Sequence, residues 1–195
     1  FVEKFGVRIV GGCCGTQPEH IHSLINRIRP QSLRKMDIKT NAVLASSVES
    51  VSMHQEPAPF LIGERLNAQG SRKFKELLLA ENYDAMIEIA RQQVESGAHG
   101  LDVCVALTER ADETSLMQKL IKRLTLEVPV PLIIDTTEPE VMEAALKTAP
   151  GKCLINSTNL ESGEEKPRKI MHLAKKYNAA LMMLTIDEKG MAKSA

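Results

Sequence analysis

The stretch that decides the fold is residues 100–158, GLDVCVALTERADETSLMQKLIKRLTLEVPVPLIIDTTEPEVMEAALKTAPGKCLINST. It contains three short apolar runs, at 100–103, 131–135 and 153–156, which predict β-strands. Between them lie two longer segments whose apolar residues recur at helical spacing. Repeated β-α-β units with nearly continuous apolar strands predict a parallel sheet covered by helices. The apolar residues of the two helical segments are Met117, Leu120, Ile121 and Leu124, then Met142, Ala145, Leu146 and Ala149.

The same alternation extends to both sides of this stretch. Further strands are predicted at 60–62 and 180–184, and further helices at 86–94 and 170–177. Because polar residues follow every strand, we expect a (β/α)8 TIM barrel rather than a doubly wound sheet, which would gather such residues in one crevice. The α/β pattern amounts to about the first half of a barrel, since a complete one takes about 250 residues.

Residues 60–195 are therefore predicted to form one domain, and the residues before them divide into two parts. Residues 1–30 are interpreted as the end of another barrel, with its last strand at 7–10 followed by a helix. Residues 31–59 are polar, contain Ser and Pro pairs, and are expected to be a linker with one possible strand near its middle.

The composition is that of an ordinary globular protein. The 195 residues have a mass of 21.5 kDa, and Lys+Arg equals Asp+Glu at 25 each. Zero net charge, 3% aromatic residues and the lack of Trp offer no basic or base-stacking surface, so we expect no nucleic-acid partner. No apolar run reaches the roughly 18 residues of a membrane span, so no membrane partner is expected. Four cysteines are typical of a reducing compartment, which predicts a cytoplasmic location.

Polar residues occur where the predicted strands end. Glu64 and Asn67 follow the first strand of the barrel, and Asp102, Asp135 and Asn156 end the next three. The carboxyl ends of parallel strands lie at one end of a barrel, so these side chains are expected to converge. Carboxylates and amides together suit a neutral heterocycle with amide and amino edges. A divalent metal is an alternative reading of the acidic residues, and simple solubilisation of the strand ends is another.

Adjacent cysteines follow two glycines near the N-terminus, in the segment Gly11-Gly12-Cys13-Cys14-Gly15. Two adjacent thiols can bind one Zn2+, which then needs one distant third ligand to form a catalytic site with an open position. Two small buried hydrophobic residues in a turn are the alternative. His20 and His22 are possible ligands on the following helix, although surface histidines are common at such positions.

The segment around these cysteines, VGGCCGTQPEHI at 10–21, resembles the end of the homocysteine-binding barrel of the cobalamin-dependent methionine synthase family. In that family three cysteines bind zinc, which activates the homocysteine thiolate, and the adjacent pair is the last two. The resemblance implies this role for Cys13 and Cys14. The third cysteine of the family lies well upstream of the pair.

The segment IGERLN at 62–67 resembles the start of the pterin-binding domain of the same family, which is shared with dihydropteroate synthase and corrinoid protein methyltransferases. The segments at 97–103, 131–135 and 154–157 continue the match in order. The resemblance implies methyl transfer from N5-methyltetrahydrofolate, via cobalamin bound by another domain or a corrinoid protein, to homocysteine, which yields methionine. It also assigns pterin-binding positions, namely Glu64 and Asn67 at the barrel entry and Asp102, Asp135 and Asn156 around the ring.

Two departures from the family are visible. Cys104 stands where the family usually has Asn, and the later barrel strands and the cobalamin motif have no counterpart among the 195 residues. We therefore expect a fragment that is inactive alone, and the sequence does not identify the group that protonates N5. Alternatives are a dihydropteroate synthase-like enzyme, another corrinoid protein methyltransferase, or a pterin-binding module without catalytic activity.

Overall fold

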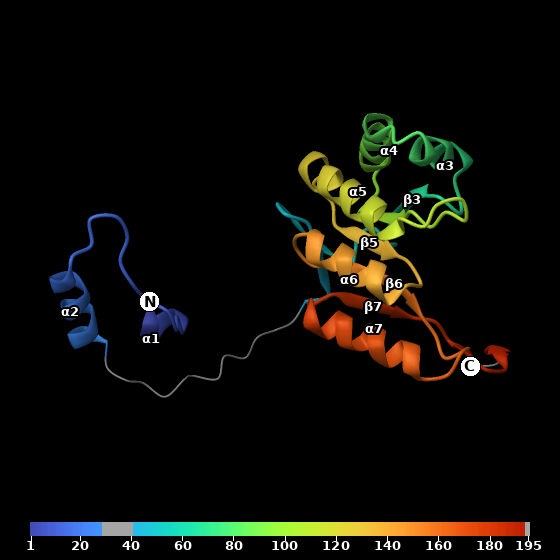
Figure 1. Ribbon diagram of the computed structural model, residues 1–195. Helices are drawn as coiled ribbons and strands as arrows, with labels where there is room; N and C mark the ends of the chain where they lie inside the picture. The colour runs from blue at the N-terminus through green and yellow to red at the C-terminus, as the bar shows by residue number, and fades with distance from the viewer. Residues whose placement is uncertain (29–40, 194–195) are drawn as a thin grey trace. The chain divides into compact units, whose positions relative to one another are not determined.

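The structure, a computed structural model, describes residues 1–28 and 41–193 (Figure 1). The chain divides into two compact units, residues 1–40 and residues 41–195. Among the helices of the described ranges, none is long and apolar enough to cross a membrane.

The first unit contains two helices, α1 (Val2–Phe5) and α2 (Pro18–Arg27). The prediction of a strand at 7–10 is wrong, because these residues are irregular and Ile9 is 91% exposed. A strand requires a neighbour that accepts and donates its backbone hydrogen bonds, and no described residue pairs with this segment.

The second unit is built around a parallel sheet of five strands, covered by helices (Figure 1). The strands are β3 (Ile62–Asn67), β4 (Gly100–Cys104), β5 (Leu132–Asp135), β6 (Leu154–Thr158) and β7 (Ala180–Met183). The helices are α3 (Arg72–Leu79), α4 (Tyr83–Glu95), α5 (Glu113–Glu127), α6 (Pro139–Thr148) and α7 (Glu165–Lys176).

The strands are paired in the order β3-β4-β5-β6-β7, which is also their order in the chain. A doubly wound sheet would reverse its strand order at a switch point, whereas successive units of a (β/α)8 barrel do not. The arrangement therefore confirms the predicted fold class, an α/β domain with the consecutive strands of a partial barrel.

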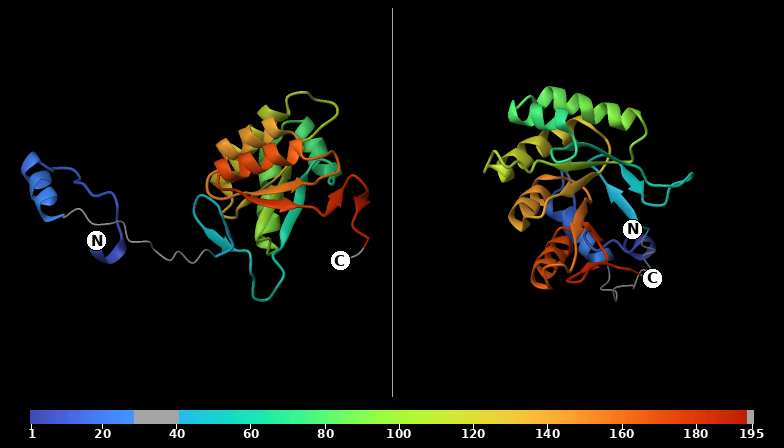
Figure 2. Two further views of the ribbon diagram at one scale, coloured as in Figure 1. Left: turned by 90° about the horizontal axis from the view of Figure 1, so that it is seen from below. Right: turned by 90° about the vertical axis from the view of Figure 1, so that its right-hand side faces the viewer.

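The two faces of the sheet have different surroundings. The helices cover one face (Figures 1 and 2), and the main hydrophobic core lies between them and the sheet. Side chains alternate along each strand, so Val103 belongs to this core while the preceding Asp102 does not. A smaller apolar cluster of Ile133, Leu154 and Leu44 is separate from this core.

Part of the segment expected to be a linker, 31–59, is folded onto the sheet domain. Strands β1 (Val43–Ala45) and β2 (Ser50–Ser52) form an antiparallel hairpin, close to the one strand expected there. Ala45 accepts a backbone hydrogen bond from Lys152 at 2.9 Å and donates one in return at 3.0 Å. These bonds join the hairpin to the second unit. The side chain of Leu44 in β1 is also fully buried, in the smaller apolar cluster with Ile133 and Leu154. The part of the segment up to residue 40 lies outside the described residues.

The first strand of the sheet and the helix after it differ from the prediction. Strand β3 begins at Ile62 rather than Phe60, because Leu61 instead bonds to His99. The Leu61 N–H donates to Nδ1 of His99 at 2.8 Å, and its carbonyl accepts the His99 N–H at 2.8 Å. Helix α3 is not apparent from the sequence, and the Ser71 side chain caps it by accepting a backbone N–H at 3.2 Å.

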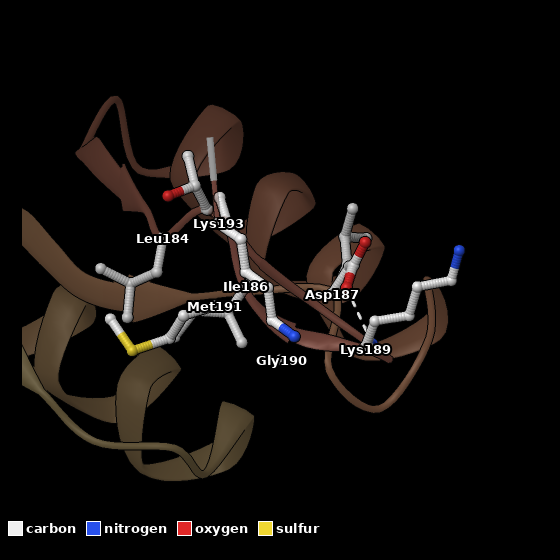
Figure 3. Close-up of a pocket in the computed structure, with 10 residues that line it drawn as sticks. Leu184, Ile186, Asp187, Lys189, Gly190, Met191 and Lys193 are labelled. Atoms are coloured by element: carbon white, nitrogen blue, oxygen red, sulfur yellow. Dashed lines mark hydrogen bonds between the residues drawn. The ribbon is translucent and has the colours of Figure 1, made fainter. Parts of the chain in front are cut away.

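A second hairpin follows β7 and consists of β8 (Ile186–Asp187) and β9 (Gly190–Met191). With the loop after β6 it surrounds a pocket of about 500 Å3 (Figure 3). Its walls include Leu160 and Leu184, and none of the polar residues predicted at the ends of the earlier strands lines it. The candidate site therefore lies elsewhere.

Candidate functional site

Four of the five predicted strand-end residues form one hydrogen-bonded group. Nδ2 of Asn67 donates to Oδ2 of Asp102 at 3.0 Å and to Oδ2 of Asp135 at 2.8 Å. Nδ2 of Asn156 donates to Oδ1 of Asp102 at 3.2 Å. We call Asn67, Asp102, Asp135 and Asn156 the strand-end cluster. The structure brings these residues together from four consecutive strands.

The register of the strands explains this convergence. Asn67 is paired with Cys104 across β3 and β4, and Asp135 is paired with Asn156 across β5 and β6. Asp102 precedes Cys104 by two residues and therefore lies on the same face of β4. Each side chain of the cluster is thus held by a rigid strand rather than by a loop.

The amide of Asn67 is oriented by the turn that follows β3. Its Oδ1 accepts backbone N–H groups from Gln69 at 2.9 Å and from Gly70 at 3.1 Å. Because the oxygen is occupied in this way, the nitrogen is directed at the two carboxylates. One amide group therefore holds both acids.

Burial controls the protonation of the two carboxylates. It is the main cause that raises the pKa of Asp102, which is 2% exposed, while hydrogen bonds from Asn67 and Asn156 lower it. The pKa of Asp135 is raised to about 6, mainly by burial and secondly by the negative charge of Asp102. The hydrogen bond from Asn67 acts in the opposite direction and lowers this pKa.

The two acids differ in what they offer a ligand. Both oxygens of Asp102 already accept hydrogen bonds within the cluster. Asp135 is less buried and shares only its Oδ2 with Asn67. A carboxylate has about four acceptor positions, so Asp135 retains capacity for N–H groups of a ligand. Of the two carboxylates, that of Asp135 is therefore the more accessible to a ligand.

Glu64 lies beside the cluster rather than within it. Its side chain is exposed and borders a hollow of about 550 Å3 that Asn67 also lines. The negative charge of Glu64 contributes to the raised pKa of both Asp102 and Asp135. Of the strand-end cluster, Asn67 alone lines this hollow.

The sequence does not single out Gln93, which supports the site from helix α4. Pairing between β3 and β4 is irregular between Gly63 and Leu66, and Arg65 lies in this interval. Oε1 of the buried Gln93 accepts the Arg65 N–H at 2.7 Å, which replaces a hydrogen bond of the sheet. A side chain at Gly63 would collide with Gln93. A glutamine on a helix carries no signal that would reveal this contact in advance.

Cys13 and Cys14 belong to the first unit and are both exposed, so the alternative of two buried hydrophobic residues is wrong. Nδ1 of His20 accepts the Gln17 N–H at 3.0 Å and is therefore occupied. No group of three His, Cys, Asp or Glu side chains in the described ranges is arranged to hold a metal ion. A catalytic zinc takes three protein ligands, so the described residues do not make a zinc site by themselves.

The strand order and the polar strand ends define an α/β domain of the barrel class, with its candidate site at the carboxyl ends of the strands. The family model described as pterin binding enzyme matches residues 63–195, and the chain belongs to this family. The model described as homocysteine S-methyltransferase matches residues 1–28. These two matches occur in the order that the resemblance to methionine synthases requires.

Similar proteins include two that are named methionine synthase. The protein from Mycobacterium tuberculosis (strain ATCC 25618 / H37Rv) is 37% identical over 198 residues, which cover 100% of this chain and 16% of the relative. The protein from Mycobacterium leprae (strain TN) is 36% identical over 204 residues, which cover 100% of this chain and 17% of the relative. The chain thus spans about one sixth of the length of these relatives, and the resemblance to their family is confirmed.

Solved structures of dihydropteroate synthases share the fold. The enzyme from Xanthomonas albilineans has a TM-score of 0.55 and 19% identity, over 79% of this chain and 53% of that protein. The enzyme from Vibrio fischeri ES114 has a TM-score of 0.52 and 17% identity, over 74% of this chain and 49% of that protein. At these identities the likeness concerns the fold alone.

Proposed function

We propose that the chain binds the pterin ring of N5-methyltetrahydrofolate and belongs to an enzyme that transfers the methyl group, via cobalamin, to homocysteine to form methionine. The proposal is supported by similarity to two methionine synthases along the whole chain. The observation that carries the binding site is the pair of carboxylates, Asp102 and Asp135, held by the single amide of Asn67.

The pterin ring has an amide edge and an amino group, which together present adjacent N–H donors. In the proposed complex Asp135 accepts these donors, because its carboxylate is the less buried of the two and its Oδ1 is not bound by Asn67. Asn156 contributes its amide oxygen, while Asp102 keeps the amides of Asn67 and Asn156 in position. Glu64 lies at the edge of the hollow through which the ligand enters.

These residues act by binding and orientation. A methyl group is transferred efficiently only when donor and acceptor are held in line, and rigid strand ends provide this for the pterin ring. Cobalamin supplies the intermediate methyl acceptor when it is bound by its own domain or by a corrinoid protein.

The homocysteine end of the reaction is proposed from the first unit. Cys13 and Cys14 match the family positions that bind zinc, and their exposure leaves both thiols accessible. Since the described residues supply only these two ligands, no step is derived through the metal. The 195 residues alone are expected not to complete the transfer, and the free cysteines are in keeping with the proposed cytoplasmic location.

Calorimetric titration of N5-methyltetrahydrofolate into the full-length protein tests the proposal, together with a methyl-transfer assay that contains cobalamin and homocysteine. Saturable binding and methionine formation are expected. Binding without transfer would indicate a module without catalytic activity. Condensation of a pterin pyrophosphate with p-aminobenzoate would instead support a dihydropteroate synthase-like enzyme, and absence of folate binding would refute the site.

A further inference from the structure

Cys104 lies in the sheet next to the strand-end cluster, but it has no role in the proposed function described above. It is the last residue of β4 and is paired with Asn67 on β3. On the other side, the register of β4 and β5 runs through Val103 and Ile134, so its next step sets Cys104 beside Asp135. Cys104 therefore lies between Asn67 and Asp135, two members of the strand-end cluster, in the direction across the strands.

A comparison with the other buried cysteine shows that Cys104 is not simply a core residue. Cys104 and Cys153 are both 4% exposed. Cys153 is a member of the main hydrophobic core, whereas Cys104 belongs to neither apolar cluster of the described residues. Cys104 is instead paired with Asn67, and the charges that act on its thiol are those of Asp135, Asp102 and Glu113.

The chemistry of the two neighbours is complementary. Burial raises the pKa of Cys104 to about 11, so the group remains a neutral thiol and keeps its S–H donor at physiological pH. The Cys104 side chain lowers the pKa of Asp135, in the same direction as the hydrogen bond from Asn67. The other charges that act on Asp135 are those of Asp102 and Glu64, and both are negative.

We propose that Cys104 is a positioning residue of the pterin site, whose S–H group donates a hydrogen bond to Asp135 and keeps that carboxylate turned toward the ligand. This inference rests on the proposed function for its ligand, but the hydrogen bond itself does not. Asn67 donates to one side of the Asp135 carboxylate from β3, and Cys104 supports it from β4. The two donors together limit rotation of a side chain that must meet two N–H groups at once.

Two variants test whether Cys104 acts through its S–H donor or only through the packing of its side chain. Cys104→Ser keeps a hydrogen-bond donor of similar size, and Cys104→Ala removes it. Cys153→Ala is the matched control, because it truncates a cysteine of equal exposure outside the site. Loss of one hydrogen bond predicts roughly 3- to 10-fold weaker binding of N5-methyltetrahydrofolate by Cys104→Ala at pH 7, and little change for Cys104→Ser or Cys153→Ala.

The pH profile distinguishes positioning from simple packing. Without its S–H donor the pKa of Asp135 rises, so the pH at which folate affinity is half-lost is expected to move upward in Cys104→Ala only. An unchanged midpoint with weaker binding would indicate a packing defect and overturn the inference. Equal effects of Cys104→Ala and Cys153→Ala would overturn it as well.

A measurement without ligand tests the bond independently of the proposed function. The S–H infrared stretching band of Cys104, obtained as the difference between the wild-type and Cys104→Ser spectra, should shift to higher frequency as Asp135 is protonated near pH 6. The band of Cys153 should not move. A Cys104 band that does not titrate refutes the hydrogen bond. A titrating band without folate binding by the wild-type protein refutes the proposed function, and with it the role toward folate.

Discussion

Replacement of Asp135 by Asn is expected to have opposite effects on binding and on stability. The variant has nearly the same shape, and its amide oxygen can still accept the hydrogen bond that Asn67 donates at 2.8 Å. It loses the charge and half of the acceptor positions of the carboxylate. A charge-assisted hydrogen bond is worth roughly 1.5–3 kcal/mol, so affinity for N5-methyltetrahydrofolate should fall about 10- to 100-fold.

The effect on stability follows from the direction of the pKa shift. In the folded protein the pKa of Asp135 is raised from 3.8 to about 6, which means that folding disfavours its charged form. This penalty is fully present above about pH 6 and disappears as the pH falls toward 3.8. The gap corresponds to at most about 3 kcal/mol, and because the side chain is partly exposed, solvent screening reduces it to about 1 kcal/mol.

Urea unfolding at pH 8 and pH 4, combined with folate titration at pH 8, tests both effects. Asp135→Asn should be about 1 kcal/mol more stable than the wild type at pH 8, with little difference at pH 4. Asp187→Asn is the matched control, since it neutralises an exposed aspartate of the β8–β9 hairpin. An Asp135→Asn protein that binds folate normally, or that is less stable at pH 8, would contradict the reasoning.

Three further variants or measurements test the rest of the site. Asn67→Ala removes the donor shared by both carboxylates, so folate affinity should fall at least about 10-fold, and urea unfolding should show a stability loss that is greatest at neutral pH. Gln93→Leu leaves the Arg65 N–H without its acceptor, which should lower the free energy of unfolding by about 1–3 kcal/mol. Zinc bound to the 195 residues through Cys13 and Cys14 should be removed readily by a chelator, and stoichiometric, chelator-resistant zinc would reveal a third ligand.

The apolar strands of the sheet could be predicted because short, continuous runs of apolar residues strongly favour buried strands. The strand expected at 131–135 is observed at Leu132–Asp135, and that expected at 180–184 is observed at Ala180–Met183. Strand β3 is less apparent, because a charged pair interrupts its apolar pattern and its pairing is irregular there. The strand predicted at 7–10 has the right composition, but strand formation also depends on a partner, which composition does not reveal.

The strand-end cluster could be predicted as a set but not as a network. The position of each polar residue after an apolar run indicates that these residues lie at the same end of the barrel, since parallel strands end on the same side. The different roles of Asn67, Asp102 and Asp135 depend on which amide nitrogen donates to which carboxylate oxygen. These pairs are determined by the register between neighbouring strands. Cys104 follows the apolar residues of a strand, and from the sequence alone it resembles an ordinary core thiol. Its cross-strand neighbours, which are polar, are not visible in the sequence.

The choice of an amide to hold the two acids follows from the requirements of the ligand. A lysine at position 67 would neutralise one charge and occupy acceptor positions that a pterin ring needs. The NH2 group of Asn67 instead binds one oxygen of each acid and leaves the negative charge in place. Burial of both carboxylates, together with the charge of Asp102 acting on Asp135, disfavours their charged forms and lowers the stability of the ligand-free protein. A ligand with several N–H donors offsets this cost, so the buried charge that destabilises the empty site is also the feature that would bind the pterin.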